Sequence, residues 1–246
     1  MQTIQEPTVA EIAANSLGAV RVFERLGIDY CCGGKKPLAE VCRQKGYDPN
    51  AVQRELQEAA SATPEPAKDW NTAPLHQLAD HIVARHHEYL KREMPSIAVR
   101  LEKVYRVYNH RRGDTLIGLP EVFSELQDEM TSHMRKEEMV LFPAIAACEA
   151  AVNGGGKLPS LPFGSVANPI RMMESEHDSA GEAIAAIRKI TNEYEIPDYA
   201  CVTYKALITG LQELEQDLHL HVHLENNILF PRILELEATQ SRTNGV

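Results

Sequence analysis

Apolar residues recur at helical spacing along most of this chain. Leu75, Leu78 and Ile82, for example, lie three or four positions apart, which places them on one face of a helix. No stretch alternates between apolar and polar positions as a half-buried strand does. The pattern therefore predicts an all-α protein, whose longer helices span residues 75–94, 96–110, 121–148, 169–193 and 198–236.

Residues 1–60 are expected to form a small unit of short helices. Thr8 and Glu11 have the spacing of a capping box, in which each side chain bonds the backbone of the other at the start of a helix. Gly27 suits the position just after a helix, where a left-handed backbone is common. Helices are therefore predicted around Val9 and over residues 18–26, 38–45 and 50–60.

A segment without helical signals separates the two helical regions. Residues 61–69 contain two prolines and no apolar period, which is typical of a linker. We therefore divide the chain into a small helical domain over 1–60, this linker, a helical bundle over 70–237 and a polar tail over 238–246. Within the bundle, residues 154–169 form a connection longer than most loops of compact domains.

The charge and composition of the chain limit its partners. A net charge of -10 argues against binding to nucleic acid, because a phosphate backbone requires a basic surface. No apolar run reaches the roughly 18 residues of a membrane span, and the first residues show no secretory signal. Five cysteines without a disulfide framework are expected in a reducing compartment. The sequence thus indicates a cytoplasmic protein that binds neither nucleic acid nor membrane.

One motif occurs twice in the predicted bundle. Residues 133–143 and 221–231 share His, Glu, Leu, Phe and Pro at the same offsets. The histidine and the glutamate are four residues apart, so on a helix their side chains point the same way. Each copy therefore offers an imidazole and a carboxylate to the same place. The closing proline is expected to kink or end its helix.

The repeat extends to a second histidine in each half. His87 lies 46 residues before His133, and His177 lies 44 residues before His221. Two such halves make a four-helix bundle with six side chains aimed inward. These side chains are His87, His133, Glu137, His177, His221 and Glu225. Four imidazoles and two carboxylates suit a pair of first-row transition-metal ions, with the carboxylates free to bridge. A lone buried histidine is usually an ordinary core residue, but four at symmetric positions favour metal.

Neighbouring polar residues are assigned simpler roles. His86 lies about 100° around the helix from His87, so only one of them is expected to face the core, and the repeat selects His87. Other histidines are expected either at the surface or in contact with the metal ligands without binding metal themselves, namely His81, His110, His219 and His223. Four acidic residues are interpreted as solvated charges by default, with a role as outer partners as the alternative: Glu129, Glu138, Glu176 and Asp178.

Cys31 and Cys32 lie in a turn rich in glycine. A disulfide between adjacent cysteines would be strained, so none is expected. The pair either fills space as two small apolar side chains or forms an exposed thiol pair that binds a soft metal ion or undergoes redox exchange. The flanking glycines favour the second interpretation. Cys42, Cys148 and Cys201 lie in predicted helices and are interpreted as packing residues.

Together these residues resemble a known family. The set of four histidines and two glutamates resembles hemerythrin-like di-iron domains. With the Tyr-Cys-Cys-Gly-Gly turn at 30–34 and the motifs at 173–178 and 221–227, the chain from about residue 8 to residue 232 resembles the iron–sulfur cluster repair di-iron proteins. The resemblance implies a hemerythrin-like antiparallel four-helix bundle preceded by a small helical N-terminal domain. It also implies two non-haem iron ions, bridged by an oxo group and by Glu137 and Glu225 and capped by the four histidines.

The resemblance further implies a redox-active repair protein rather than a conventional turnover enzyme. Such a protein restores iron–sulfur proteins after nitrosative or oxidative damage, by supplying iron, and the damaged proteins are its partners. The alternatives are a sensor or sink that binds nitric oxide or oxygen, and a di-iron nitric oxide reductase. Cys31 and Cys32 favour repair, since a gas-binding protein has no evident need of a thiol pair, and they would serve the N-terminal domain. Homodimer formation is left open.

Overall fold

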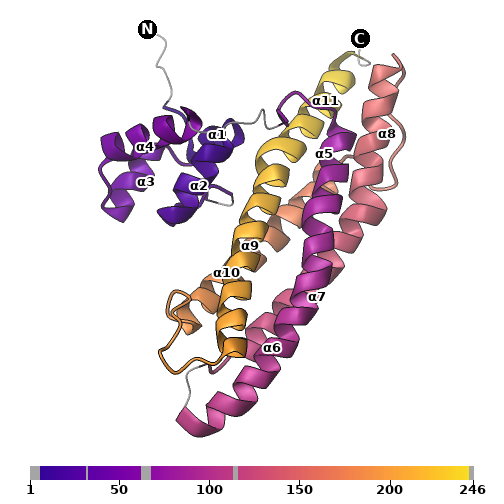
Figure 1. The fold of residues 1–246 in the computed structure, drawn as a ribbon. Coiled ribbons are helices and arrows are strands. Elements are labelled where there is room, and N and C mark those ends of the chain that lie inside the picture. Colours follow the sequence, from indigo (N-terminus) through magenta and orange to yellow (C-terminus); the bar gives the residue numbers. More distant parts are fainter. Residues whose placement is uncertain (1–5, 32, 62–67, 113–115, 244–246) are drawn as a thin grey trace. The chain divides into compact units, whose positions relative to one another are not determined.

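Helices make up almost all of the regular structure (Figure 1). The computed structural model describes residues 6–31, 33–61, 68–112 and 116–243. Within these ranges, β pairing is limited to two isolated bridges, Thr8 with Pro37 and Leu161 with Gly164. The predicted all-α fold is confirmed. Among the described residues, no helix combines the length and the apolar character that a membrane crossing requires.

Four helical columns follow one another along the chain and form the expected antiparallel four-helix bundle (Figure 1). The first consists of α5 (Leu75–Ile82), η1 (Val83–His87) and α6 (Glu88–Arg112), and the second of α7 (Leu119–Lys136), η2 (Glu137–Leu141) and α8 (Phe142–Asn153). The third is α9 (Ala167–Ile190), and the fourth consists of α10 (Val202–Leu224), η3 (Glu225–Leu229) and α11 (Phe230–Thr243). The η segments are π-helical turns, in which backbone hydrogen bonds span five residues instead of four.

The chain divides into two compact units. One comprises Met1–Leu78 together with His219–Val246, and the other comprises Ala79–Leu218. The first unit therefore combines the N-terminal helices with the C-terminal part of the fourth column. The linker over 61–69 remains a prediction, since residues 62–67 lie outside the described ranges. Helix α11 extends to Thr243, into the stretch expected as a polar tail.

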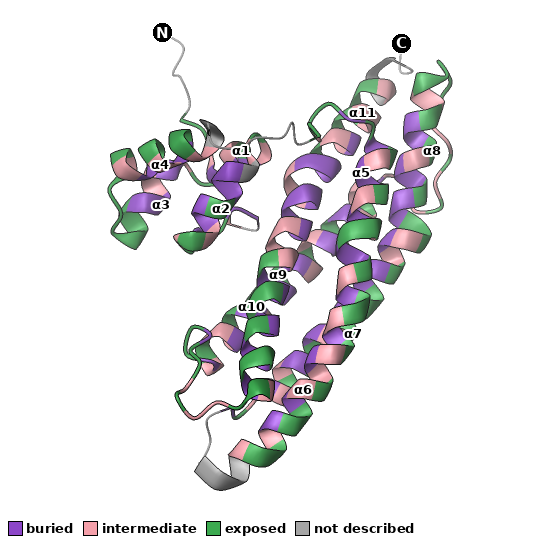
Figure 2. Ribbon diagram, viewed as in Figure 1, coloured by how far each residue is buried: buried purple, intermediate pink, exposed green. Residues whose placement is uncertain are grey.

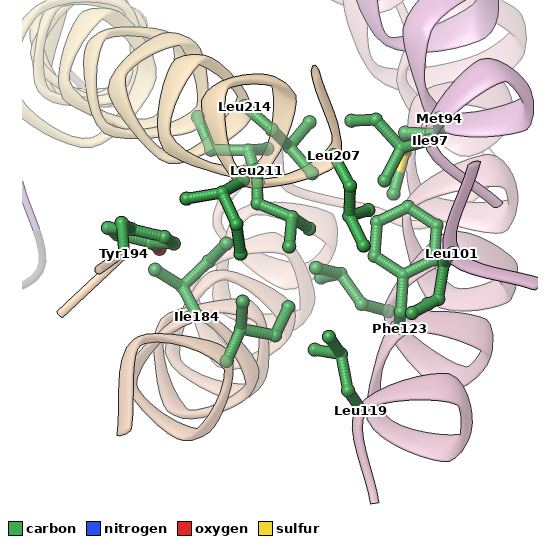
Figure 3. Packing of buried hydrophobic residues seen from close by; sticks show 14 of the residues in the cluster. Met94, Ile97, Leu101, Leu119, Phe123, Ile184, Tyr194, Leu207, Leu211 and Leu214 are labelled. Carbon is green, nitrogen blue, oxygen red and sulfur yellow. The ribbon is translucent and has the colours of Figure 1, made fainter. Parts of the chain in front are cut away.

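The larger unit has a core to which α6, α7, α9 and α10 all contribute. Figure 3 shows side chains of these helices converging, among them Ile97, Phe123 and Leu211. All three are at most 1% exposed, and burial of a side chain of this size contributes about 1.5–3 kcal/mol. Along each helix, buried positions recur every three or four residues, with exposed positions between them (Figure 2). The periodic apolar positions of the sequence are therefore the packing surfaces of the bundle.

Helix α6 continues through Pro95, where the sequence predicts a break between two helices. The proline is exposed, so the carbonyl that loses its helical partner can bond to water. The hydroxyl of Ser96 donates to the carbonyl of Arg92 at 3.1 Å. Met94 and Ile97 are buried on the core side. Their packing stabilises a continuous helix despite the proline, which is why the predicted break is wrong.

An ion pair joins α9 to α10 in this unit. The Arg188 guanidinium donates to Oε1 of Glu215, from Nε at 3.1 Å, and the Glu215 side chain is 5% exposed. Breaking a buried pair costs about 3–5 kcal/mol, and the partial exposure of Arg188 reduces this to about 2–3 kcal/mol. We expect Arg188→Ala to lower the free energy of unfolding by that amount in urea denaturation. Lys189→Ala, an exposed neighbour, should change it by less than about 0.5 kcal/mol. Equal effects of the two variants would show that the pair is not stabilising.

The N-terminal helices of the first unit begin and end close to the predicted positions. Helix α1 (Val9–Ala14) starts at the capping box, in which the Glu11 amide donates to Oγ1 of Thr8 at 3.2 Å and the Thr8 amide donates to Oε2 of Glu11 at 2.8 Å. Gly27 follows α2 (Leu17–Arg25) with φ +60°, as its type predicts. Helices α3 (Leu38–Lys45) and α4 (Pro49–Ser61) complete the series.

These short helices share an apolar core with part of the fourth column. Val9, Phe23 and Val52 belong to it and are at most 3% exposed. Leu220 of α10 packs against the same core, and α1 packs against η3. A chain of about 60 residues buries too little surface for a generous core of its own. The C-terminal column therefore supplies apolar contacts that the N-terminal helices need.

Candidate metal centre

Each of the three π turns carries a predicted metal ligand. His87 is the last residue of η1, Glu137 is the first residue of η2 and Glu225 is the first residue of η3. π turns are rare and are found frequently at functional sites. Their coincidence with three predicted ligands marks this part of the bundle as a functional site.

The prolines of the repeated motif follow these π turns without ending the helix. The amide of Phe142 bonds back to the carbonyl of Glu137, five residues earlier. Pro143 then takes an early position in α8, where a helix needs no N–H donor. The same order of π turn, phenylalanine and proline recurs at Pro231. The chain therefore stays helical through both prolines, because a new α-helix starts after each π turn, so the expected end is wrong and the expected kink stays a prediction.

The predicted ligands are buried and fall into two groups. His87, His133, Glu137, His177, His221 and Glu225 are each at most 1% exposed. Within each group, one ligand atom per residue lies within 4.8 Å of the others. The first group is His87, Glu137, His221 and Glu225, and the second is His133, Glu137, His177 and Glu225. Glu137 and Glu225 belong to both groups, as carboxylates that bridge two ions would.

Glu137 lies between two imidazoles. Its Oε2 is 3.4 Å from Nε2 of His87 and 3.2 Å from Nε2 of His133. In the second copy of the motif, Nε2 of His221 is 3.1 Å from Oε1 of Glu225. In each of these pairs Nε2, rather than Nδ1, is the imidazole nitrogen that faces the carboxylate.

The outer nitrogen of two imidazoles is held by a glutamate. Nδ1 of His87 is 2.8 Å from Oε1 of Glu138, and Nδ1 of His133 is 2.9 Å from Oε2 of Glu176. An ionised carboxylate only accepts hydrogen bonds, so Nδ1 is the donor in each pair. This arrangement is usual for histidines that bind metal through the other nitrogen. The interpretation of Glu138 and Glu176 as solvated charges is therefore wrong, because each reaches a histidine on a neighbouring column.

A lysine contacts each of these glutamates. Nζ of Lys91 is 2.9 Å from Oε1 of Glu138, and Lys136 contacts Oε1 of Glu176. Burial raises the pKa of Glu138, but hydrogen bonds from its lysine and histidine partners outweigh this and hold the pKa below its ordinary value. The same balance lowers the pKa of Glu176. Both carboxylates are therefore ionised at neutral pH.

The inner atoms of the site suit bound cations. Both carboxylate oxygens of Glu137 are buried and accept no hydrogen bond from any described residue. Nε2 of His133 lies 3.1 Å from Nε2 of His177. Burial of an ionised carboxylate is costly unless a charge compensates it, and a metal ion among these atoms would do so. Imidazole and carboxylate ligands together suit first-row transition metals, iron included.

Comparison with known proteins agrees with this geometry. Residues 78–233 match the hemerythrin HHE cation binding domain, and residues 5–60 match a domain of unknown function. The chain is 38% identical to the iron-sulfur cluster repair protein YtfE of Citrobacter koseri over 232 residues, which are 94% of this chain and 98% of the relative. The proteins of the same name from Escherichia coli O81 and Escherichia fergusonii are 38% and 37% identical over 230 residues, which are 94% of this chain and 97% of each relative.

The chain belongs to the iron–sulfur cluster repair protein family. Its cation-binding domain includes all six predicted ligands, and the two ligand groups provide a site for metal ions. The expected hemerythrin-like fold is thereby confirmed.

His86 is buried in this member of the repair family, although only His87 was expected to face the core. His86 is 1% exposed, and its Nδ1 lies 3.1 Å from Oδ1 of Asp217 on α10. His87 faces Glu137 on the second column instead. A helix inside a bundle contacts two neighbouring columns, so its buried arc can exceed the angle between consecutive residues. The assignment of only one core histidine is therefore wrong.

His223 is also buried and contacts the N-terminal turn of this repair family member. It is 2% exposed, and its Nδ1 lies 3.4 Å from the carbonyl of Tyr30. Burial lowers the pKa of His223 to about 4, so the ring is neutral at pH 7. The Asn227 amide donates to the carbonyls of Tyr30 at 3.2 Å and Cys31 at 3.4 Å. His223 is thus a packing residue, and not the surface residue or outer metal partner that the sequence favoured.

The Cys31 turn is compact. Cys31 is 6% exposed, and its Sγ donates to Oδ1 of Asp29 at 3.2 Å. Oδ2 of Asp29 accepts from the Gly33 amide at 2.9 Å. A Cβ at Gly34 would lie 2.6 Å from the carbonyl of Tyr30, so glycine is required there. The expected exposure of the thiol is wrong for Cys31, and Cys32 lies outside the described residues.

The other cysteines differ in their surroundings. Cys42 and Cys148 are at most 1% exposed and lie within helices, which confirms their interpretation as packing residues. Cys201 is exposed and lies just before α10, so the same interpretation is wrong for it. The predicted helix began too early there, because α10 starts only at Val202.

Proposed function

We propose that this chain is a di-iron protein that repairs iron–sulfur clusters damaged by nitrosative or oxidative stress. The observation that carries the di-iron proposal is the membership of Glu137 and Glu225 in both ligand groups. These carboxylates and an oxygen atom would bridge the two ions. His87 and His221 would cap one ion, and His133 and His177 would cap the other. The names of relatives aligned over nearly their whole length support repair as the activity.

The repair is proposed to consist of iron supply. Iron bound at this site would be an ion that can change oxidation state and can be passed to a damaged cluster. Glu137 and Glu225 suit this role, because a carboxylate can change between bridging and terminal binding as the charge beside it changes. The residues of the ligand shell are at most 1% exposed, so the shell limits the access of water. These buried side chains would hold iron in a site shielded from solvent.

The proposed partners are damaged iron–sulfur proteins in the cytoplasm, with nitric oxide or oxygen as small ligands. The five cysteines are spread along the sequence without a disulfide framework, which favours a reducing compartment. The net charge of -10 supports protein partners over nucleic acid. We assign the chain a redox-active repair role in which iron is consumed, and not a conventional catalytic turnover.

Iron content and reactivation test this function together. Protein purified without air should contain about two iron ions per chain, consistent with the ligand set. Added to an iron–sulfur dehydratase inactivated by nitric oxide, the iron-loaded protein should restore activity, whereas metal-free protein should not. An equal amount of free ferrous iron is the matched control and should restore less.

Three results would contradict the proposal. Protein that holds only zinc after growth in iron-rich medium would argue against a di-iron centre. Rapid loss of nitric oxide with an electron donor, without reactivation, would indicate a reductase. Protection of the dehydratase only when the protein is present before nitric oxide would indicate a sink for the gas.

A further inference from the structure

Two glutamates outside the ligand set are placed in the same way. Glu138 follows the ligand Glu137 on the second column and reaches His87 on the first. Glu176 precedes the ligand His177 on the third column and reaches His133 on the second. Each glutamate thus neighbours one ligand in the sequence and holds another ligand on an adjacent column. All of these residues belong to the unit Ala79–Leu218.

The histidine is the more important partner of each glutamate. The Lys91 and Lys136 side chains are 41% and 37% exposed, and an ion pair with so exposed a lysine contributes at most about 1 kcal/mol. The imidazoles of His87 and His133 are at most 1% exposed. A charge-assisted hydrogen bond to a buried group is stronger than a solvated one. The lysines therefore help to place the carboxylates, and the carboxylates act on the imidazoles.

We propose that Glu138 and Glu176 are positioning residues of the metal centre. Each keeps a proton on Nδ1 of one imidazole and so presents Nε2 to a metal ion. The inference rests on the proposed function to the extent that the site holds metal. His87 and His133 belong to different ligand groups, so each glutamate controls the affinity for one of the two ions. Substitution of one of these glutamates should therefore give a protein that binds one ion tightly and the other weakly.

The physical basis is the choice between two tautomers. A neutral imidazole carries its proton on either nitrogen, and the nitrogen without the proton is the one that binds metal. Without Glu138, the Nδ1 proton of His87 loses its acceptor in a buried place, and the Nε2 tautomer would gain Glu137 as an acceptor. That tautomer cannot bind the ion through Nε2. Loss of such an outer partner typically lowers metal affinity 10–100-fold, so about this change is expected here.

The test uses the full chain with zinc, a diamagnetic ion that imidazole and carboxylate also bind. Zinc affinity is measured by calorimetry, and the imidazole nitrogens are assigned by ¹⁵N NMR in the zinc-loaded and the metal-free protein. Glu138→Leu should weaken one of the two ions by about 10–100-fold and remove the protected Nδ1–H signal of His87 only. Glu176→Leu should weaken the other ion and remove the signal of His133 only.

Conservative variants separate positioning from folding. Glu138→Gln keeps the volume and an acceptor oxygen, so the His87 signal should persist, with an affinity between those of wild type and Glu138→Leu. Asp178→Asn is the matched control, because exposed Asp178 follows His177 as Glu176 precedes it. It should leave both affinities unchanged. Lys91→Met should lower the affinity by less than about fivefold, in line with its exposure.

Unchanged affinity and an unchanged Nδ1–H signal in Glu138→Leu would overturn the inference. Equal weakening of both ions by either variant would also overturn it, since that result indicates a general loss of structure. If the wild-type chain bound no metal, the di-iron function would fail separately. The Nδ1–H signals of the metal-free wild type and variants would then still decide whether the glutamates set the tautomers.

Discussion

Replacement of Glu137 with leucine should leave the protein without bound iron and with its helices intact. Glu137 contributes a ligand atom to both groups, so its loss removes a ligand from each ion. Leucine can occupy the buried space, and the apolar contacts of the bundle do not involve the carboxylate. We expect the iron content, measured by metal analysis, to fall from about two ions per chain to less than about 0.2. Circular dichroism should show unchanged helix content.

Without metal, Glu137→Leu should be more stable than wild type, although it is the variant that binds no iron. Without metal, wild type must bury the Glu137 carboxylate, whose oxygens accept no hydrogen bond from the described residues. Glu137→Leu removes that cost and should raise the free energy of unfolding of the metal-free protein by about 1–4 kcal/mol. With iron, wild type should unfold at the higher temperature, because bound metal stabilises the folded state. Both comparisons follow from one buried carboxylate that needs a cation.

A second variant tests the same role at the other shared carboxylate, and a third serves as a control. Glu225→Leu should behave in the same way, because Glu225 is the other carboxylate present in both groups. Glu125→Leu changes an exposed carboxylate of α7 and should retain iron. Retention of both irons by Glu137→Leu or by Glu225→Leu would rule out a bridging role for that residue.

The second large effect is expected at the cysteine pair. The double variant Cys31→Ala/Cys32→Ala should keep its iron and its absorption spectrum, since neither ligand group includes a cysteine. It should nevertheless reactivate a damaged iron–sulfur dehydratase at least about tenfold more slowly, because a thiolate can hold ferrous iron in transit. Sγ of Cys31 is held by Asp29 in a compact turn. The turn must therefore open before the thiol can reach a partner.

A variant of a buried thiol in the same unit serves as the control. Cys42 is 0% exposed and lies in α3. Cys42→Ala should lower the free energy of unfolding by about 1 kcal/mol. Its rate of reactivation per folded molecule should equal that of wild type. Reactivation by the double variant at the wild-type rate would exclude iron transfer by the thiols. The N-terminal helices would then serve as a docking element.

All six candidate ligands could be predicted from the sequence. The spacing of His133 and Glu137 and its repetition at His221 and Glu225 depend on the pitch of a helix, which is a local property. The apolar period likewise predicted the four columns, because one face of each helix has to be buried. The capping box of Thr8 and Glu11 could be recognised for the same reason, as it involves only the first turn of α1.

Which of the acidic neighbours are hydrogen-bond partners of the candidate ligands could not be decided in this way. Glu138 and Glu176 are polar and adjacent to ligands in the sequence, which is equally true of solvated residues such as Asp178. What distinguishes them is the neighbouring column within hydrogen-bonding distance. The burial of His86 against Asp217 has the same origin. These outcomes depend on which helices pack side by side, and helical spacing alone does not contain that information.

The π turns also depend on tertiary structure. An ideal α-helix fixes the direction of every side chain once one is known, whereas a π turn shifts the phase of everything that follows it. The sequence by itself determined that His87, Glu137 and Glu225 lie on helices that face a common core. The tertiary structure decided that each sits at a π turn and that the helix continues past Pro143 and Pro231. A π turn is unfavourable in isolation, so it persists only where packing and buried polar groups on neighbouring columns compensate for its cost.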